Sequence, residues 1–497
     1  MGSVEEDLKS ISFGKRVAEE EQEALRSYFV ETSQWRRIIE GEVDIVYGAK
    51  GSGKSAIYSL LVQSGPELAR NGVIVRAAEK PQGLPAFAEV VADPPGSEEE
   101  WRALWRAYFL CLVAEVLREE EVGTEEAVRV FRGLETEKLI STRGGLAGAL
   151  NSARAWARQV AQVEGEGGVS ADPATGAVSA TAKVRLEHGS KNAALRAAIA
   201  TAGVDLLEAA NTALADAGLH VWIALDRLDV AFTDAEDVER DALRALFRVY
   251  LDFVGLAQIT PKVFLRSDIW DRITTEKGFR EGSHITRGER IDWNRDLLLN
   301  LVVRRVVENK AVVNRYGIDP ETVLGSVAEQ EKLFYRIFPE QIESGQNQVA
   351  TFDWIISRTR DGLGQTVPRE IIHLLGTLKV HQLERLEIGH EEPTDNRLFE
   401  RATFRSAIGP VSESRLKQTL YNESPKLKRN IEALRGGQTS YSLDELREIW
   451  SATEEDSRII ADALVGVGFF ERRPTNEREF SIPFLYRPGL ELNGRSA

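Results

Sequence analysis

Residues 48–55 read Gly48-Ala49-Lys50-Gly51-Ser52-Gly53-Lys54-Ser55, which matches the pattern G-x-x-x-x-G-K-S. The apolar run 43–47 precedes this stretch, and the apolar run 56–62 follows it. A glycine-rich loop between a strand and a helix is typical of the phosphate-binding P-loop. Glycines are needed because the backbone N–H groups must turn inward around the phosphates, in conformations that a Cβ atom would block. The flanking strand and helix argue against a chance match.

The positions of this stretch have predicted roles in binding a nucleoside triphosphate. Lys54 supplies a cation to the β- and γ-phosphates, and Ser55 supplies a hydroxyl to Mg²⁺. The helix that begins there points its positive end at the anion. We therefore predict a nucleotide and Mg²⁺ as cofactors. The predicted nucleotide-binding residues are Gly48, Ala49, Lys50, Gly51, Ser52, Gly53, Lys54, Ser55 and Ala56.

A second motif follows about 170 residues behind the first. The apolar run Val221-Trp222-Ile223-Ala224-Leu225 ends at Asp226, and Asp229 lies three residues further on. This is the Walker B arrangement, in which a buried strand carries a carboxylate to the P-loop serine. We predict that Asp226 and Ser55 bind Mg²⁺ and that Asp229 orients the attacking water. Strands also often end in a turn-forming acid, so the motif has weight only together with the P-loop.

Two arginines stand where P-loop proteins place groups that respond to the γ-phosphate. The predicted strand 262–265 ends at Arg266, at a position where a cationic group senses hydrolysis or projects to a neighbouring subunit. Arg369 lies in the first turn of a helix that begins near Pro368, where it would fold over the nucleotide as a lid residue. The alternatives are an ordinary surface arginine at a strand end and a plain arginine at a helix start.

Length and composition are typical of a soluble protein of several domains. The chain has 497 residues, 42% of them apolar and 28% charged, and this length suggests roughly three domains. Its longest apolar stretches, such as residues 108–114, are much shorter than a membrane span. The N-terminus is acidic, whereas a signal peptide would be basic and then apolar. We expect a cytoplasmic protein that does not contact membranes.

Charge and metal-binding residue types argue against some functions. The net charge of −15 does not suit a sequence-independent DNA binder, because such proteins present a basic surface to the phosphates. A local basic groove, or one formed on oligomerisation, is compatible with this charge. The single cysteine, Cys111, excludes an internal disulfide and a multi-thiolate zinc site. The six histidines have no metal-binding spacing, so we expect no protein-bound transition metal.

Strand and helix patterns alternate in the first half of the chain, as in a layered α/β fold. Residues 72–78 are a second strand candidate, and residues 101–118 have apolar residues at helical spacing. Residues 120–190 fit poorly, because two short β runs flank a turn at Asp172–Gly176 and suggest a projecting hairpin. This insertion is compatible with a pore, partner or substrate element, or with a solvated decoration, which we favour.

Helical periods replace the strand signals from Trp293 to about Gln382. Capping boxes at Ser442 and Thr453 then predict two short helices, and a hairpin follows in residues 467–483. Helix, turn, helix and hairpin is the order of a winged helix. The predicted regions are an N-terminal helical lead-in (1–40), a P-loop core with the insertion (41–275), a helical lid (276–395) and a winged-helix domain (396–497).

The predicted winged helix is better suited to packing or protein contacts than to DNA. In a DNA reader, the first turn of the second helix approaches bases or phosphates. Here that turn is acidic, and phosphate would repel it. Its residues are Glu454, Glu455 and Asp456. The arginines that would instead favour DNA are Arg458, Arg472, Arg473 and Arg478.

The order of these motifs resembles the STAND-, KAP- and origin-recognition-like branch of bacterial P-loop ATPases, which is related to AAA+. The resemblance covers most of the chain outside the insertion. Its motifs are Phe13-Gly14-Lys15, the P-loop, Leu225-Asp226-Arg227-Leu228-Asp229, Leu265-Arg266-Ser267-Asp268 and Val367-Pro368-Arg369-Glu370. It implies a core with an additional strand, a helical lid, ATP as the nucleotide, and oligomers with nucleotide near subunit boundaries.

The resemblance also implies residue roles, and the sequence departs from it at one position. It implies that Asp226 binds Mg²⁺, Asp229 polarises water, Arg266 takes the arginine position of the strand tip, and Arg369 is the lid sensor. AAA+ proteins have Glu directly after the Walker B Asp, but this chain has Arg227. That departure favours a slow switch over a fast motor.

Three functions are therefore compatible with the sequence. The first is an oligomeric switch that binds and slowly hydrolyses ATP, serving a bacterial antiphage or conflict system with a separate effector protein. This biological role comes from the resemblance alone. The second is a DNA-binding initiator or loader that uses the winged helix, and the third is a nucleotide-bound scaffold with little hydrolysis.

Overall fold

The protein is described by a computed structural model, whose described residues are 3–15, 21, 25–78, 94–136, 153–155, 204–228, 235–275, 279–473 and 476–492. Contacts between residues divide the chain into two compact units. The sheet unit comprises Thr32–Ala49 and Lys54–Ile291. The helical unit comprises Met1–Glu31, Lys50–Gly53 and Asp292–Ala497.

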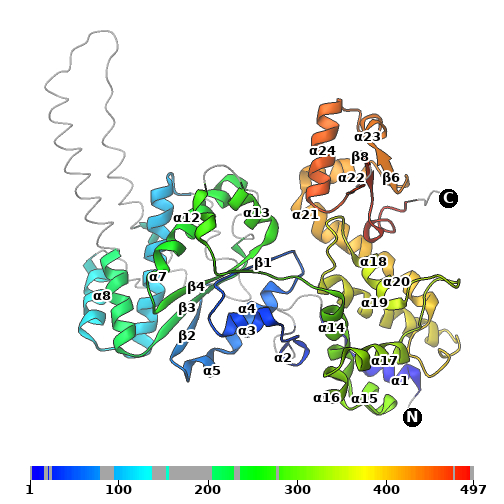
Figure 1. The fold of residues 1–497 in the computed structure, drawn as a ribbon, viewed down its shortest axis with the longest axis horizontal. Helices are drawn as coiled ribbons and strands as arrows, with labels where there is room; N and C mark the ends of the chain where they lie inside the picture. Colours follow the sequence, from blue (N-terminus) through cyan, green and yellow to red (C-terminus); the bar gives the residue numbers. More distant parts are fainter. Residues whose placement is uncertain are drawn as a thin grey trace, which may run out of the picture. The chain divides into compact units, whose positions relative to one another are not determined.

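A parallel sheet of five strands forms the centre of the sheet unit (Figure 1), in the order β2-β3-β4-β1-β5. The strands are β1 (Ile45–Gly48), β2 (Val73–Ala77), β3 (His220–Leu225), β4 (Ile259–Arg266) and β5 (Gly288–Arg290). The four strands predicted from the apolar runs are confirmed. The apolar runs do not predict β5, which is a short strand at the edge of the sheet.

Strand β4 lies between β1 and β3, the two strands that lead into the P-loop and the Walker B motif. Its residues Val263, Phe264 and Leu265 are all at most 2% exposed. Apolar side chains on both faces are typical of a central strand in a parallel sheet. The predicted α/β fold with an additional strand between the two motif strands is thereby confirmed.

Helices cover both faces of the sheet: Figure 1 shows α12 and α13 on one side and α3, α4 and α5 on the other. The long helix α7 covers the predicted helix 101–118, and its Trp105 Nε1 donates to the Ala242 carbonyl of α12 at 2.9 Å. The helices of this unit are α3 (Ser33–Ile39), α4 (Lys54–Gln63), α5 (Gly65–Ala69), α7 (Glu98–Glu119), α8 (Glu125–Thr136), α12 (Glu236–Phe253), α13 (Ser267–Thr275) and the 3-10 helix η2 (Arg280–His284).

A buried charge cluster lies beside the start of β1, next to the middle of β4. The Lys262 side chain is 1% exposed, and its Nζ donates to the Val43 carbonyl at 2.6 Å and to Asp44 Oδ1 at 2.9 Å. The second oxygen of Asp44 accepts from the Tyr250 hydroxyl at 3.0 Å and pairs with Arg287 Nε at 3.0 Å. Burial lowers the pKa of Lys262, and the Asp44 carboxylate opposes that shift. Asp44 therefore compensates a cation that has no access to water.

Removal of the Asp44 carboxylate tests this compensation. We expect Asp44→Ala to lower the free energy of unfolding by about 3–5 kcal/mol, because it leaves a buried charge without its partner. Urea denaturation measures the change. The exposed Asp216 is a control, since Asp216→Ala should change stability by less than about 0.5 kcal/mol. A loss no larger in Asp44→Ala than in the control would contradict the role of the cluster.

Helices make up most of residues 295–387 in the helical unit, as the helical periods predict. They are α14 (Arg295–Val307), α15 (Lys310–Tyr316), α16 (Pro320–Leu324), α17 (Val327–Ile337), α18 (Thr351–Thr359) and α19 (Pro368–Glu387). The N-terminal helices α1 (Val4–Ser10) and α2 (Leu25–Tyr28) belong to this unit, and Val4 and Leu8 are part of its core. The predicted lead-in 1–40 is thus divided, because α3 belongs to the sheet unit.

The last hundred residues form short helices and a small antiparallel sheet in the order β6-β8-β7. Both predicted helix starts are observed, at Ser442 with a full capping box and at Thr453. The elements are α20 (Arg401–Ser414), the π-helix η3 (Arg415–Leu420), α21 (Tyr421–Glu423), η4 (Pro425–Leu427), α22 (Lys428–Glu432), β6 (Ser440–Ser442), α23 (Leu443–Trp450), α24 (Glu454–Gly466), β7 (Glu471–Arg473), β8 (Asn476–Ser481) and η5 (Phe484–Tyr486). The winged-helix assignment, like the four-region division, stays a prediction.

Part of the predicted insertion is helical. It contains α8 and the helical residues 153–155, and residues 204–216 form the helix that returns to β3. The predicted hairpin around Asp172–Gly176 lies outside the described residues. Among the helices that the structure describes, none combines the length and apolarity needed to cross a bilayer.

Candidate functional site

The glycine-rich loop connects the end of β1 at Gly48 to the start of α4 at Lys54. Gly51 has φ +85° and Gly53 has φ +101°, both in the region that residues with a side chain rarely adopt. These glycines let the backbone turn sharply between strand and helix, as a loop that surrounds an anion requires. The predicted strand–loop–helix context of the motif is thus present.

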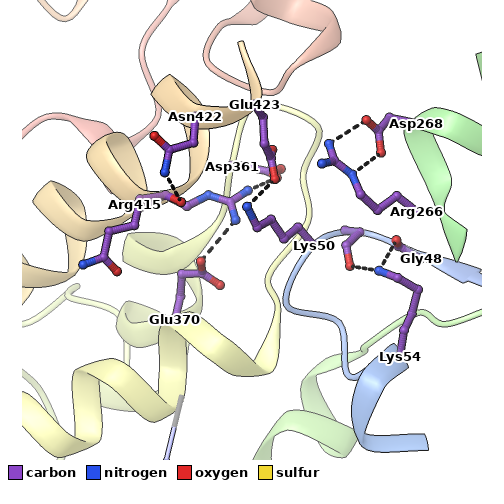
Figure 2. Close-up of polar contacts among 12 residues, drawn as sticks. Gly48, Lys50, Lys54, Arg266, Asp268, Asp361, Glu370, Arg415, Asn422 and Glu423 are labelled. Atoms are coloured by element: carbon purple, nitrogen blue, oxygen red, sulfur yellow. Dashed lines mark hydrogen bonds and ion pairs between the residues drawn. The ribbon is translucent and has the colours of Figure 1, made fainter. Parts of the chain in front are cut away.

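Lys54 is the first residue of α4, and its side chain folds back over the loop (Figure 2). Its Nζ donates to the carbonyl oxygens of Gly48 at 2.8 Å and Ala49 at 2.9 Å. The ammonium group is therefore held at the loop that precedes its own helix. An anion bound by the loop would meet both this cation and the positive end of α4.

The tip of the loop, Lys50–Gly53, has its contacts within the helical unit. Trp293 Nε1 donates to the Ser52 carbonyl at 2.8 Å, and Lys50 Nζ pairs with Glu423 Oε1 of α21 at 2.7 Å. A Cβ atom on Gly51 would lie 2.9 Å from Arg369 Cβ, closer than real Cβ contacts. Arg369 thus packs directly on the loop.

Asp226 directly follows the last residue of β3 and is 6% exposed. Leu225 pairs with Val263 of β4, which pairs with Ile45 of β1. Since all three strands are parallel, Asp226 lies at the same edge of the sheet as the glycine-rich loop. Arg227 has φ +59°, so the chain turns away from the strand immediately after this carboxylate. Asp229 lies outside the described residues.

Arg266 is the last residue of β4 and pairs in register with Gly48. Its guanidinium makes a bidentate ion pair with Asp268, with Nε–Oδ1 at 3.0 Å and Nη2–Oδ2 at 2.7 Å (Figure 2). Loss of hydration would raise the pKa of Asp268, but the charge of Arg266 and, more weakly, that of Lys54 hold it below its ordinary value. The strand tip therefore carries a cation in register with the first residue of the loop, and the role of Arg266 at a γ-phosphate stays a prediction.

Two buried polar atoms of the loop region have no hydrogen-bond partner among the described residues: Ser52 Oγ and Arg369 Nε. Buried donors without partners are rare in folded proteins, because each costs desolvation energy. A phosphate oxygen would satisfy such donors. The glycine conformations and the position of Lys54 likewise suit a bound anion.

A buried ion network lies next to Arg369 in sequence and was not foreseen. Arg415 Nη1 pairs with Glu370 Oε1 at 3.1 Å, and its Nη2 lies 3.6 Å from Asp361 Oδ2. Burial alone would lower the pKa of Arg415, but Glu370, Tyr486 and Asp361 raise it, so the guanidinium stays charged. The network fixes the first turn of α19, and with it Arg369. The capping and periodicity signals give no hint of pairs so far apart in sequence.

Gly51 provides a test of the loop geometry. We expect Gly51→Ala to destabilise the protein by about 1–3 kcal/mol, because alanine is strained at this positive φ and its Cβ meets Arg369. Thermal denaturation measures the effect. Gly376 in the middle of α19 is the matched control, since Gly376→Ala meets no neighbouring atom and should be neutral or stabilising by up to about 1 kcal/mol. Equal stability of Gly51→Ala and wild type would contradict the described loop.

No protein-family model and no curated protein matches the chain. Among solved structures, the ORC2 protein of Aeropyrum pernix, determined as ADPNP–ADP complexes, is similar to it. The two chains share 13% sequence identity, and the match covers 95% of this chain and 94% of that chain with a TM-score of 0.31. A TM-score this low transfers no residue role to this chain.

Proposed function

We propose that the protein binds ATP and Mg²⁺ at residues 48–56 and hydrolyses ATP slowly, as a switch. The observation that carries this proposal is the loop itself: its glycines adopt positive φ, and Lys54 folds over it. The loop also lies at the sheet edge where a buried carboxylate ends β3. The choice of ATP over other triphosphates comes from the family resemblance.

In this proposal, different residues bind the phosphates and the Mg²⁺ ion. The loop N–H groups and Lys54 bind the β- and γ-phosphates, and Arg369 donates from its buried Nε. Ser55 and Asp226 hold Mg²⁺, which when bound neutralises charge that develops on the phosphates. The described residues contain no cluster of three or more potential metal-ligating side chains. One carboxylate and one hydroxyl suit Mg²⁺, which keeps several waters and takes further ligands from phosphates.

We base slow hydrolysis on the residue that follows Asp226. AAA+ proteins have a glutamate directly after the Walker B aspartate, whereas this chain has Arg227 there, and its positive φ turns the chain away from the strand. A cation there does not accept a proton from water. We propose that Asp229 orients the attacking water and that Arg266 responds to the γ-phosphate from the tip of β4.

The biological part of the proposal rests on the family resemblance. We propose a homo-oligomer that acts in a bacterial antiphage or conflict system through a separate effector protein. The contacts of the C-terminal arginines support protein contacts over DNA binding. Arg458 Nη2 lies 3.2 Å from Glu454, Arg478 also pairs with Glu454, and Arg472 pairs with Asp462. Carboxylates thus already neutralise three of the four arginines that would favour DNA, and the side chain of Arg473 is outside the described residues.

Lys54→Ala tests nucleotide binding. We expect it to reduce ATP affinity by at least about 100-fold, because one charge-assisted contact of this kind is worth roughly 3 kcal/mol. Isothermal titration calorimetry with ATP measures the affinity. Lys332, which is 68% exposed on α17, provides the control variant Lys332→Ala with unchanged affinity. Wild-type affinity in Lys54→Ala would refute the proposed site.

Asp226→Asn tests the Mg²⁺ ligand. The amide cannot supply a negative charge, so we expect half-saturation of ATP turnover to need at least about tenfold more Mg²⁺, with the fold intact. A Mg²⁺ titration of phosphate release, with circular dichroism as the folding control, measures this. An unchanged Mg²⁺ dependence would remove Asp226 from the site. If the wild-type protein binds ATP but does not hydrolyse it, the function of a nucleotide-bound scaffold is favoured.

A further inference from the structure

We propose that Asp268 is a positioning residue whose carboxylate pairs with Arg266 until a γ-phosphate displaces it, and that this competition limits the preference of the site for ATP over ADP. This inference rests on the proposed nucleotide-binding function and deepens it. It concerns four residues of the sheet unit: Gly48, Lys54, Arg266 and Asp268.

Arg266 and Asp268 lie where the glycine-rich loop begins. Arg266 is in register with Gly48, where the glycine-rich loop begins, and Asp268 lies two residues further, in the first turn of α13. The charge of Lys54 also acts on Asp268. Asp268 therefore pairs directly with Arg266 and only weakly feels the charge of Lys54, and both cations have predicted roles at the phosphates.

The ion pair between Asp268 and Arg266 is bidentate. Both Asp268 oxygens bind the guanidinium, one at Nε and one at Nη2. This fork-to-carboxylate arrangement is the one with which arginine also binds a phosphate. The edge of Arg266 that would bind a γ-phosphate is thus occupied by Asp268. An incoming phosphate must replace that carboxylate or leave this edge of the guanidinium unused.

The two side chains of the ion pair differ in their exposure to water. The Arg266 side chain is 18% exposed, whereas that of Asp268 is 58% exposed. The Asp268 carboxylate has lost hydration where it faces Arg266, but the rest of its side chain already contacts water, so opening the pair costs less on its side than on that of Arg266. Asp268 can therefore rotate into water while Arg266 stays beside the loop. Repulsion between the carboxylate and a triphosphate favours the same movement.

The consequence is a cost that falls on ATP binding but not on ADP binding. ADP lacks the group that would compete for Arg266, so the ion pair persists beside ADP. ATP binding breaks the pair, and this cost weakens ATP binding. Asp268 thus makes Arg266 available only when the third phosphate is present, and it limits how tightly ATP binds.

The test compares ATP and ADP affinities of the full-length protein by isothermal titration calorimetry. Asp268→Asn should bind ATP about three- to tenfold more tightly than wild type, since a bidentate, partly exposed ion pair no longer has to open. Its ADP affinity should stay within about twofold of wild type. Asp268→Glu should keep the wild-type ratio. The control is Asp271→Asn, which removes an exposed carboxylate from the same helix and should leave both affinities unchanged.

A double variant shows whether the effect passes through Arg266. In the Arg266→Gln background, adding Asp268→Asn should change the ATP-to-ADP affinity ratio by less than about twofold, because the arginine that it releases is absent. A purely structural role of Asp268 would lower thermal stability without changing the ratio. The inference is wrong if Asp268→Asn leaves the ratio unchanged, weakens ATP binding, or shifts ATP and ADP equally.

The measurements distinguish a failure of the Asp268 role from a failure of the proposed nucleotide binding. If wild type binds neither ATP nor ADP, the proposed function is wrong and the inference falls with it. If wild type binds ATP through Lys54 while the ratio in Asp268→Asn equals that of wild type, only the inference falls.

Discussion

The parallel register of β1, β4 and β3 is the constraint on which the candidate site depends. Parallel strands end at one edge of a sheet, so Gly48, Arg266 and Asp226 share that edge although more than 170 residues separate the first from the last. The buried pair of Lys262 with Asp44 favours this register, because a slip by one residue would move Lys262 to the other face and away from its partner. Without this pairing, the loop would have neither an adjacent cation nor a carboxylate.

Charge compensation is the second theme of the molecule. Three buried or half-buried cations pair with a carboxylate: Arg266 with Asp268, Lys50 with Glu423, and Arg415 with Glu370. Beside the start of β1, Asp44 serves Lys262 in the same way. Such pairs contribute little net stability when formed, but a strong penalty follows when one partner is lost. The pairs therefore act mainly to fix where the cations lie.

The glycine-rich loop also has a structural role in the helical unit. Its tip residues Lys50–Gly53 contact Trp293, Arg369 and Glu423, which come from three separate parts of that unit. A change in the loop conformation must therefore disturb at least one of these contacts.

The sequence alone determined the local features of this protein. The glycine spacing, the apolar run ending at Asp226 and the capping boxes each depend on residues near one another, so they predicted the loop, four of the five parallel strands and the starts of α23 and α24 correctly. The strand β5 was missed because three residues carry too little periodicity. The contacts of Lys50 with Glu423, and of Arg415 with Glu370 and Asp361, were decided by the tertiary structure, because ion pairs between distant segments leave no pattern in composition or spacing. Asp268 combines both kinds of information. Its position two residues after the end of a strand can be read from the sequence. That the pair of Asp268 with Arg266 lies beside Gly48 depends on which strand β4 pairs with, and only the folded sheet decides that.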